Sequence, residues 1–238
     1  MNALILAAGR GTRVRTLHDR PKCLLEIGGV ALLDRYIRAL DAMGVETTIV
    51  AGYCADEVRE RLDTLAPRTP CTIIVNDDFE RGSILSLACG LAVVDGALLL
   101  LDGDVLFHPD MLRRLVQTSN ENTLLVDVGT TFTNEEYMTG LDGGRVNALG
   151  RRPVEGHAAT GEWVGFARLD AASVSRFRKA IRAQIAAGQT AGGYEDALAS
   201  LLPDMDMRYE DVSDLPWVEI DFPADVERAT ALVSQGRI

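Results

Sequence analysis

Residues 1–29 read MNALILAAGRGTRVRTLHDRPKCLLEIGG, and this stretch decides the fold. A short apolar segment, residues 2–7, runs directly into a loop of small residues that includes Gly9 and Gly11. Short apolar runs that end at glycine are typical of buried strands. In doubly wound sheets, ligands bind beside loops at the carboxyl ends of the strands. The opening therefore predicts a first β-strand followed by a ligand-binding loop.

This first loop is basic, although the chain as a whole has a net charge of −11. An acidic protein is poorly suited to broad contact with nucleic acid or with an anionic membrane, so we expect neither as a partner. Small residues let backbone N–H groups approach phosphate oxygens, and Arg and Lys side chains add charge. The basic residues of the stretch are Arg10, Arg13, Arg15, Arg20 and Lys22. They predict a local site for a polyphosphate.

Two familiar phosphate motifs are excluded, and a plain turn is the remaining alternative. The G-x-G-x-x-G fingerprint lacks its third glycine, because Val14 stands there, and no Walker sequence G-x-x-x-x-G-K-[ST] is present. A plain flexible turn explains neither the dense positive charge nor Pro21, which restricts the backbone just before Lys22.

Length and composition indicate a globular α/β protein. The chain has 238 residues, of which 47% are hydrophobic and 25% are charged. We expect a single domain over residues 1–238 with a lid or acceptor insertion at about 130–170. The four cysteines form no CxxC pair, which favours reduced thiols in a cytoplasmic protein. We also expect no signal peptide and no transmembrane segment.

Strands and helices are predicted to alternate through the first half. The expected strands are 2–7, 46–51, 71–75, 97–101 and 123–128, and the expected helices are 32–43, 55–65, 83–93 and 109–117. This order implies a mostly parallel sheet covered on both faces. Short strands over 136–169, with a turn at Gly143 and Gly144, predict an antiparallel extension. Helices at 171–187, 194–202 and 223–234 and a strand at 207–211 are expected to complete the chain.

Acidic pairs lie at two predicted strand ends. Asp102 and Asp104 follow the strand at 97–101, and Glu219 and Asp221 lie in a short segment near the carboxyl terminus. Strand alternation places the members of each pair on one face. Neighbouring carboxylates repel each other unless a cation joins them, and ligand sets made only of oxygen favour Mg²⁺. The alternatives are a structural Asp-Gly-Asp turn and a helix N-cap at Asp221.

Together these segments resemble the signature of the nucleotidyltransferase family, the sugar-nucleotide pyrophosphorylase-like enzymes. The matching motifs are LAAGRGTR at 6–13, RPKCLLEIGG at 20–29, LDGD at 101–104 and EID at 219–221. Within the family, residues 83–87, 161–165 and 217–221 are most similar to cytidylyltransferases that act on phosphocholine or phosphonates. The resemblance implies a GT-A-like nucleotide-diphospho-sugar transferase fold, that is, a Rossmann-like sheet flanked by helices with a small antiparallel lid. Homodimers are common in the family, so a dimer is an open expectation.

The implied activity is transfer of CMP from CTP to a small phosphate- or phosphonate-bearing acceptor, with Mg²⁺ as cofactor and pyrophosphate as product. Two alternatives stay open: a sugar-1-phosphate nucleotidyltransferase that uses UTP, dTTP or GTP, and a regulatory nucleotide-binding domain. The acceptor is open as well. Arg151 and Arg152 stand where relatives often carry lysine, and Ser83 stands where choline-type relatives carry asparagine.

The resemblance also implies roles for individual residues. Catalytic contacts to phosphate are expected from Arg13 and Lys22, and metal ligation from Asp104 and Asp221 with support from Asp102 and Glu219. The expected nucleotide-binding residues are Leu6, Ala7, Ala8, Gly9, Gly11, Thr12, Arg13, Ser83, Ser86 and Asp102. The expected acceptor-binding residues are Tyr137, Arg151, Glu162, Tyr194, Trp217 and Glu219, and Trp163 is a further candidate aromatic wall.

Overall fold

The computed structural model describes residues 1–14, 19–130, 132–133 and 135–238. Arg15, assigned above to the basic loop, lies outside the described residues. The helices are α1 Leu32–Ala42, α2 Ala55–Leu65, α3 Ser83–Val93, α4 Pro109–Gln117, α5 Ala171–Ala186, α6 Glu195–Leu201 and α7 Pro223–Ser234, with short 3-10 turns at Lys22–Leu24, Phe79–Arg81 and Leu202–Asp204. The strands are β1 Asn2–Ala7, β2 Glu26–Ile27, β3 Val30–Ala31, β4 Glu46–Ala51, β5 Cys71–Val75, β6 Leu98–Asp102, β7 Val105–Phe107, β8 Thr123–Asp127, β9 Met138–Asp142, β10 Arg145–Gly150, β11 Ala159–Leu169, β12 Arg208–Asp211 and β13 Trp217–Glu219.

Within the described residues, the main sheet has nine strands in the order β5-β4-β1-β6-β11-β8-β12-β10-β9. The first four strands are parallel, as the alternating pattern predicts. Strand β11 runs antiparallel to both β6 and β8, so the second half of the sheet is mixed. Strands β9, β10 and β11 follow one another without crossover helices, and β9 pairs antiparallel with both β10 and β11. The predicted α/β fold is confirmed.

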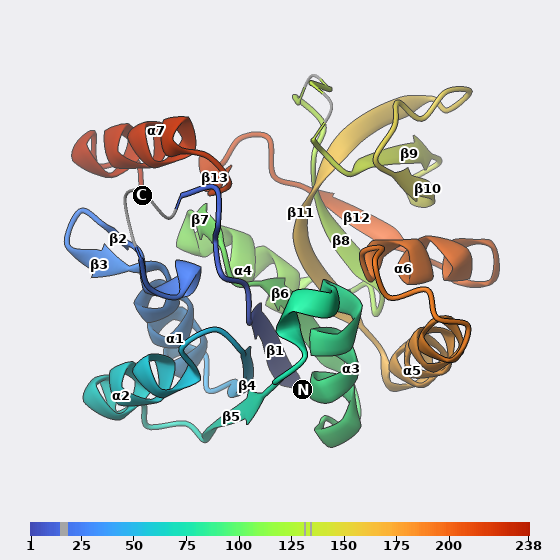
Figure 1. Cartoon of the computed structure of the whole chain (residues 1–238). Helices are drawn as coiled ribbons and strands as arrows, with labels where there is room; N and C mark the ends of the chain where they lie inside the picture. The colour runs from blue at the N-terminus through green and yellow to red at the C-terminus, as the bar shows by residue number, and fades with distance from the viewer. Residues whose placement is uncertain (15–18, 131, 134) are drawn as a thin grey trace.

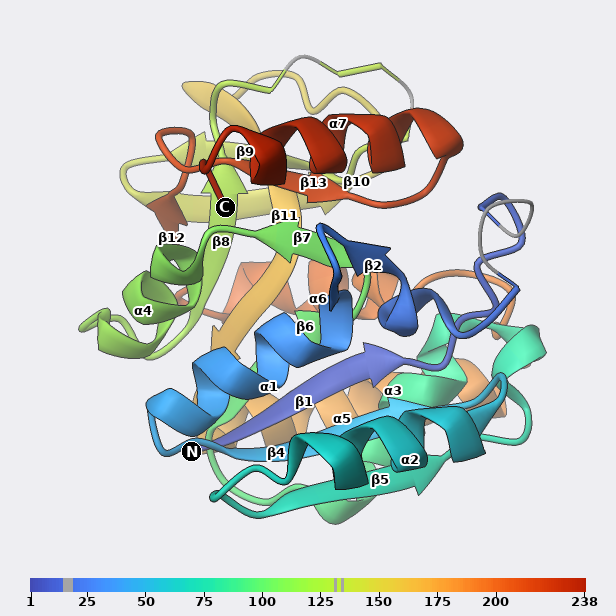
Figure 2. The same cartoon turned by 90° about the vertical axis from the view of Figure 1, so that its left-hand side faces the viewer.

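The sheet separates two apolar cores. Helices α1, α2 and α4 pack against one face and α3, α5 and α6 against the other, as Figure 1 and Figure 2 show. Alternate residues of β1 enter opposite cores: Ala3 and Ile5 enter one, and Leu4 enters the other. This arrangement explains why β1 is apolar from Ala3 to Ala7, since both faces of the strand are covered.

The antiparallel segment predicted over 136–169 is also confirmed. Strands β9 and β10 form a hairpin whose turn residues, Gly143 and Gly144, have φ angles of 56° and 77°. Two consecutive positive φ angles fit a tight hairpin turn, which glycine adopts without steric cost. Strand β9 also pairs with β11, so this segment continues the main sheet.

Three distant segments meet at the carboxyl ends of β1 and β6. The N–H of Gly103 donates to the carbonyl of Leu6 at 2.9 Å, and the N–H of Ile220 donates to the carbonyl of Asp104 at 3.0 Å. Strand β13 pairs with β7 and holds Glu219 beside Val105. A Cβ atom at Gly103 would lie 2.7 Å from the Leu6 carbonyl oxygen, so only glycine permits this approach.

Strand β7 and the β2–β3 hairpin were not predicted from the sequence, because strands of two or three residues show no recognisable periodicity. Among the helices in the described part of the chain, none combines the length and apolar character that a membrane crossing demands.

Candidate active site

A cavity of about 450 Å³ opens at the point where these three segments meet. Most of the predicted nucleotide, catalytic and metal residues line it together. They are Leu6, Ala8, Gly9, Gly11, Thr12, Arg13, Lys22, Ser83, Ser86, Asp102, Asp104, Glu219 and Asp221, joined by Arg151 and Tyr194 from the predicted acceptor set. Ala7 is predicted for the same site but is buried and does not line the cavity.

The glycine-rich loop passes closely over Lys22. Gly11 has a φ of 62°, and its carbonyl accepts a hydrogen bond of 3.1 Å from the N–H of Val14. A Cβ atom at Gly11 would lie 3.1 Å from the Cβ of Lys22 and 3.3 Å from a methyl group of Val14. Glycine is therefore required here both for the backbone angle and for the close contact.

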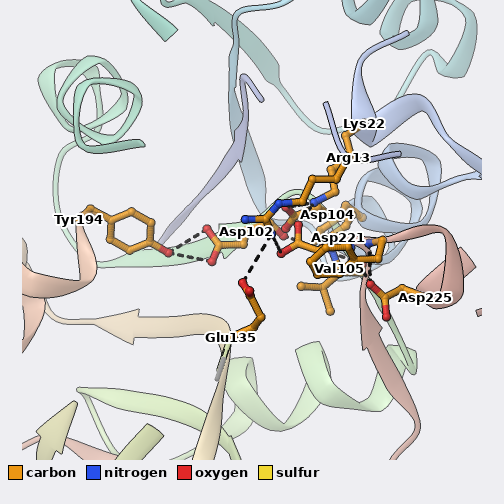
Figure 3. A network of polar contacts seen from close by, with 11 residues as sticks. Arg13, Lys22, Asp102, Asp104, Val105, Glu135, Tyr194, Asp221 and Asp225 are labelled. Carbon is orange, nitrogen blue, oxygen red and sulfur yellow. Dashed lines mark hydrogen bonds and ion pairs between the residues drawn. The ribbon is translucent and has the colours of Figure 1, made fainter. Parts of the chain in front are cut away.

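Lys22 is the centre of the charged network in Figure 3. Its Nζ donates to Asp104 Oδ2 at 2.8 Å and to Asp221 Oδ1 at 2.6 Å, and its side chain is only 10% exposed. Burial alone would lower the pKa of the Lys22 ammonium, but the two carboxylates outweigh burial and raise the pKa above its ordinary value. Lys22 is therefore a permanent cation that joins two distant acidic segments.

Arg13 adds a second positive charge at the rim of the cavity. Its Nη1 lies 3.5 Å from Asp221 Oδ2 and 3.5 Å from Glu135 Oε2. The guanidinium also lies 4.9 Å from the centre of the Phe222 ring. The side chain is 50% exposed, so it can turn toward an anion in the cavity.

Three carboxylates in the cavity form a candidate cation site. One oxygen each from Asp104, Glu219 and Asp221 lie within 4.8 Å of one another. Oδ1 of Asp104 is buried and has no hydrogen-bond partner among the described residues, although buried polar atoms are almost always paired. A donor set of three carboxylates suits a hard divalent cation such as Mg²⁺. These residues therefore fit the predicted metal.

The Glu219 carboxyl shows how strongly this cluster concentrates negative charge. Its side chain reaches solvent through the cavity, while protein encloses it on the other sides. This enclosure, followed by repulsion from Asp104 and Asp221, raises the pKa of Glu219 to about 8. A bound cation would relieve that repulsion.

Asp102 lies apart from the three-carboxylate cluster, which differs from the supporting metal role expected for it. Both of its carboxylate oxygens accept from the Tyr194 hydroxyl, at 2.8 and 2.9 Å. Burial, followed by repulsion from Asp104, raises the pKa of Asp102 well above its ordinary value. Gly165 leaves room for this side chain, because a Cβ atom there would lie 2.5 Å from Asp102 Oδ2. Asp102 therefore shapes the wall between β6 and α6.

The alternative N-cap role for Asp221 is wrong. The N-cap of helix α7 is Phe222, and Asp225, at the third helical position, accepts through Oδ2 from the N–H of Asp221 at 3.0 Å and from the N–H of Phe222 at 2.7 Å. The carboxylate of Asp221 instead faces Lys22 and the cavity.

A second cavity, of about 440 Å³, shares Glu219 and Asp221 with the first. Its wall carries seven carboxylates, from Asp127, Glu135, Glu136, Glu162, Glu219, Asp221 and Asp225, beside the aromatic rings of Trp217 and Phe222. Trp217 Nε1 donates to Asp127 Oδ2 at 2.9 Å. Burial, the largest cause, raises the pKa of Glu162 to about 7.

The predicted acceptor residues thus do not line a single cavity. Glu162 and Trp217 line the second cavity, while Arg151 and Tyr194 line the first. Tyr137 lines neither, and its ring instead lies 4.7 Å from the Arg151 guanidinium carbon.

Trp163 is not a cavity wall, contrary to its candidate role. It is 5% exposed, its Nε1 donates to the carbonyl of Phe166 at 3.0 Å, and its ring contacts Tyr194. Glu195 also lines the first cavity, and so does Phe79, which was not predicted from the sequence. Phe79 was open to prediction, because it follows the carboxyl end of β5, on the edge where ligands bind.

A family model described as "MobA-like NTP transferase domain" matches residues 3–203. A "Bifunctional IPC transferase and DIPP synthase" from Rubrobacter xylanophilus is 26% identical over 237 residues, covering 98% of this chain and 52% of the relative. A "CTP:phosphoglutamine cytidylyltransferase" from Campylobacter jejuni is 28% identical over 138 residues, covering 53% of each chain.

A sugar-phosphate enzyme also matches. An "N-acetylmuramate alpha-1-phosphate uridylyltransferase" from Caulobacter vibrioides is 39% identical over 110 residues, covering 43% of this chain and 42% of the relative. The chain thus spans about half the length of these curated relatives. Among solved structures, the CTP:phosphocholine cytidylyltransferase from Streptococcus pneumoniae has a TM-score of 0.78 at 19% identity, covering 98% of both chains, which shows a common fold.

Proposed function

The chain belongs to the MobA-like NTP transferase family, and on that premise we propose that it is a cytidylyltransferase, which transfers CMP from CTP to a small phosphate- or phosphonate-bearing acceptor. One observation carries the proposal. The basic glycine loop, Lys22 and three distant carboxylates line a single cavity large enough for a nucleotide. Two observations support CTP as the donor. One relative is named as a CTP-dependent cytidylyltransferase, and the segments that are most similar to cytidylyltransferases are residues 83–87, 161–165 and 217–221.

The proposed reaction is an in-line displacement at the α-phosphorus of CTP. An oxygen of the acceptor's phosphate or phosphonate forms the new P–O bond as the bond to the β-phosphate oxygen breaks and pyrophosphate leaves. The attacking oxygen is already an anion at neutral pH, so the step requires no general base. The barrier comes mainly from bringing two anions together and from charge that develops on pyrophosphate.

The residues of the first cavity meet both demands. Backbone N–H groups of the glycine loop, Arg13 and Lys22 would hold the triphosphate and stabilise the negative charge of the leaving group. Asp104, Glu219 and Asp221 would hold Mg²⁺. When bound, Mg²⁺ would supply further neutralisation of phosphate charge.

The second cavity is the proposed acceptor site. Its concentration of carboxylates is unfavourable for an acceptor that is only anionic, and it favours one with a cationic group. The Trp217 and Phe222 rings can contact a quaternary ammonium or an amine through cation–π attraction. Arg151 lies in the neighbouring cavity, where it can contact the acceptor's phosphate or phosphonate. We therefore favour phosphocholine, phosphoethanolamine or an aminoalkyl phosphonate over a neutral sugar phosphate.

The segment at about 130–170 is proposed as the acceptor insertion of a single domain. It contributes Glu135, Glu136 and Glu162 to the second cavity and Arg151 to the first. This placement supports the proposal that the segment separates the CTP site from the acceptor site.

The uridylyltransferase relative supports one competing function, transfer of a nucleotide to a sugar 1-phosphate. The regulatory-domain alternative has less support, because Lys22, Asp104 and Asp221 are all present and in direct contact.

The test is pyrophosphate release in the presence of Mg²⁺, with CTP, UTP, dTTP and GTP each paired with each acceptor. The acceptor panel contains phosphocholine, phosphoethanolamine, 2-aminoethylphosphonate, inositol 1-phosphate and glucose 1-phosphate. We expect turnover with CTP and the cation-bearing acceptors. Turnover confined to UTP or dTTP with a sugar phosphate would overturn the proposal.

A further inference from the structure

Asn76 and Ser86 form a buried polar pair behind the wall of the first cavity. Asn76 directly follows β5 and Ser86 lies on α3. The two residues are 3% and 4% exposed, and Asn76 Nδ2 donates to Ser86 Oγ at 2.9 Å. Ser86 lines the cavity, whereas Asn76 does not.

The orientation of the Asn76 amide is determined by its second contact. Its Oδ1 accepts a hydrogen bond of 3.0 Å from the N–H of Asp78. Rotating the amide by 180° would bring its NH₂ group against that N–H, donor against donor. The NH₂ group must therefore face Ser86, so Ser86 Oγ accepts from Asn76 and keeps its own proton for another partner.

We expect the hydrogen-bond acceptor for the Ser86 hydroxyl inside the cavity. Among the described residues, no hydrogen bond donated by the Ser86 hydroxyl is found. Ser83, one turn before Ser86 on α3, also lines the cavity, as do the uncharged side chains of Leu6 and Phe79. Asp104 and Asp221, by contrast, contact Lys22. A nucleotide placed with its triphosphate near Lys22 would bring its flat, uncharged base to the end that contains Ser86.

We propose that Asn76 is a positioning residue that sets nucleotide specificity. By donating to Ser86, it makes the Ser86 hydroxyl a hydrogen-bond donor toward the base. Ring atom N3 of cytosine accepts a hydrogen bond, whereas N3–H of uracil donates one, so this hydroxyl selects CTP over UTP. A buried donor that faces another donor is left unpaired, and this is the kind of mismatch that polar sites reject most strongly. The inference rests on the proposed use of CTP.

The decisive variant is Asn76→Asp, which keeps the shape of the side chain and reverses one hydrogen bond. The carboxylate still accepts from the N–H of Asp78 but can no longer donate to Ser86. Instead it accepts the Ser86 proton, and the lone pairs of Ser86 Oγ then face the base and suit uracil N3–H. We expect the ratio of kcat/KM for CTP to that for UTP to fall at least about tenfold.

Measuring the ratio isolates this effect, because a new negative charge weakens the binding of both triphosphates alike. Asn2→Asp is the matched control, since it makes the same substitution at the amino end of β1, opposite the cavity, and should leave the ratio unchanged. Ser86→Ala should also lower the ratio. The double variant Asn76→Asp/Ser86→Ala should then show no further fall, since Asn76 acts only through Ser86.

The outcomes separate the inference from the proposed function. A wild-type protein that does not prefer CTP refutes the proposed donor and this inference with it. A wild-type protein that prefers CTP, together with an unchanged ratio in Asn76→Asp, refutes the inference alone. If thermal unfolding shows that Asn76→Asp is not folded, Ser86→Ala decides, and an unchanged ratio in that variant also refutes it.

Discussion

Replacing Lys22 with Met should change cation affinity and turnover in opposite directions. In the structure, the Lys22 ammonium contacts Asp104 at 2.8 Å and Asp221 at 2.6 Å, two of the three carboxylates that form the candidate cation site. The ammonium and a divalent cation therefore compete for the same oxygens. Met keeps most of the chain's volume against Gly11 but removes the charge.

The contacts give the size of both effects. A hydrogen bond between charged groups contributes about 1.5–3 kcal/mol. If cation binding must displace the ammonium from even one such contact, its removal should tighten cation binding about tenfold. Turnover should fall about a hundredfold, since one charged contact to the transition state is worth about 3 kcal/mol.

Two measurements check this pair of effects. Titration of the nucleotide-free protein with Mn²⁺ as the probe ion reports cation affinity, and pyrophosphate release reports turnover. Lys179→Met is the matched control, because Lys179 is the only other lysine of the chain and lies exposed on α5. It should change neither quantity.

A wild-type rate of turnover in Lys22→Met would show that Lys22 does not contact the reacting phosphates and would refute its proposed role. Weaker Mn²⁺ binding in the variant would refute the competition, since it would mean that Lys22 organises the carboxylates instead of occupying their site.

Three further predictions concern positions around the cavity. Tyr36→Phe removes a buried hydroxyl that contacts the backbone on both sides of Asp104. The free energy of unfolding should fall by about 1–3 kcal/mol, and pyrophosphate release should require more Mg²⁺ for its half-maximal rate; an unchanged requirement would contradict this role. Burial raises the pKa of Glu162 from 4.5 to about 7, so the native state keeps a proton that the unfolded state loses in this range, and stability should fall as pH rises through it. In urea unfolding with chelator, the free energy of unfolding of Glu162→Gln should fall less than that of the wild type as pH rises from 4.5 to about 7, by an amount on the order of 3 kcal/mol. An equal fall in both proteins would argue against the shift. Gly82→Ala would place a Cβ atom 2.0 Å from the Thr190 carbonyl oxygen, at a residue whose φ is 126°. The free energy of unfolding should therefore fall by at least about 1–3 kcal/mol. Wild-type stability in that variant would show that the loop at Thr190 moves freely.

Much of the fold was open to prediction because its signals are local. The apolar run of β1, the helical spacing of α1 and the paired glycines of the β9–β10 turn each reflect short-range preferences and burial on known faces. The short pairing of β7 with β13 could not be predicted from the sequence, since it depends on contact between segments far apart in the chain.

The sequence by itself determined the chemistry available to this protein: a basic glycine loop and acidic residues, each placed at a strand end. Only the tertiary structure decided which of these groups meet. It brought Asp104, Glu219 and Asp221 together around Lys22, turned Asp102 toward Tyr194, and placed Asn76 behind Ser86. The physical reason is that side-chain direction at an irregular turn follows from long-range packing and hydrogen bonds, such as that from Ile220 to Asp104, which no local pattern in the sequence records.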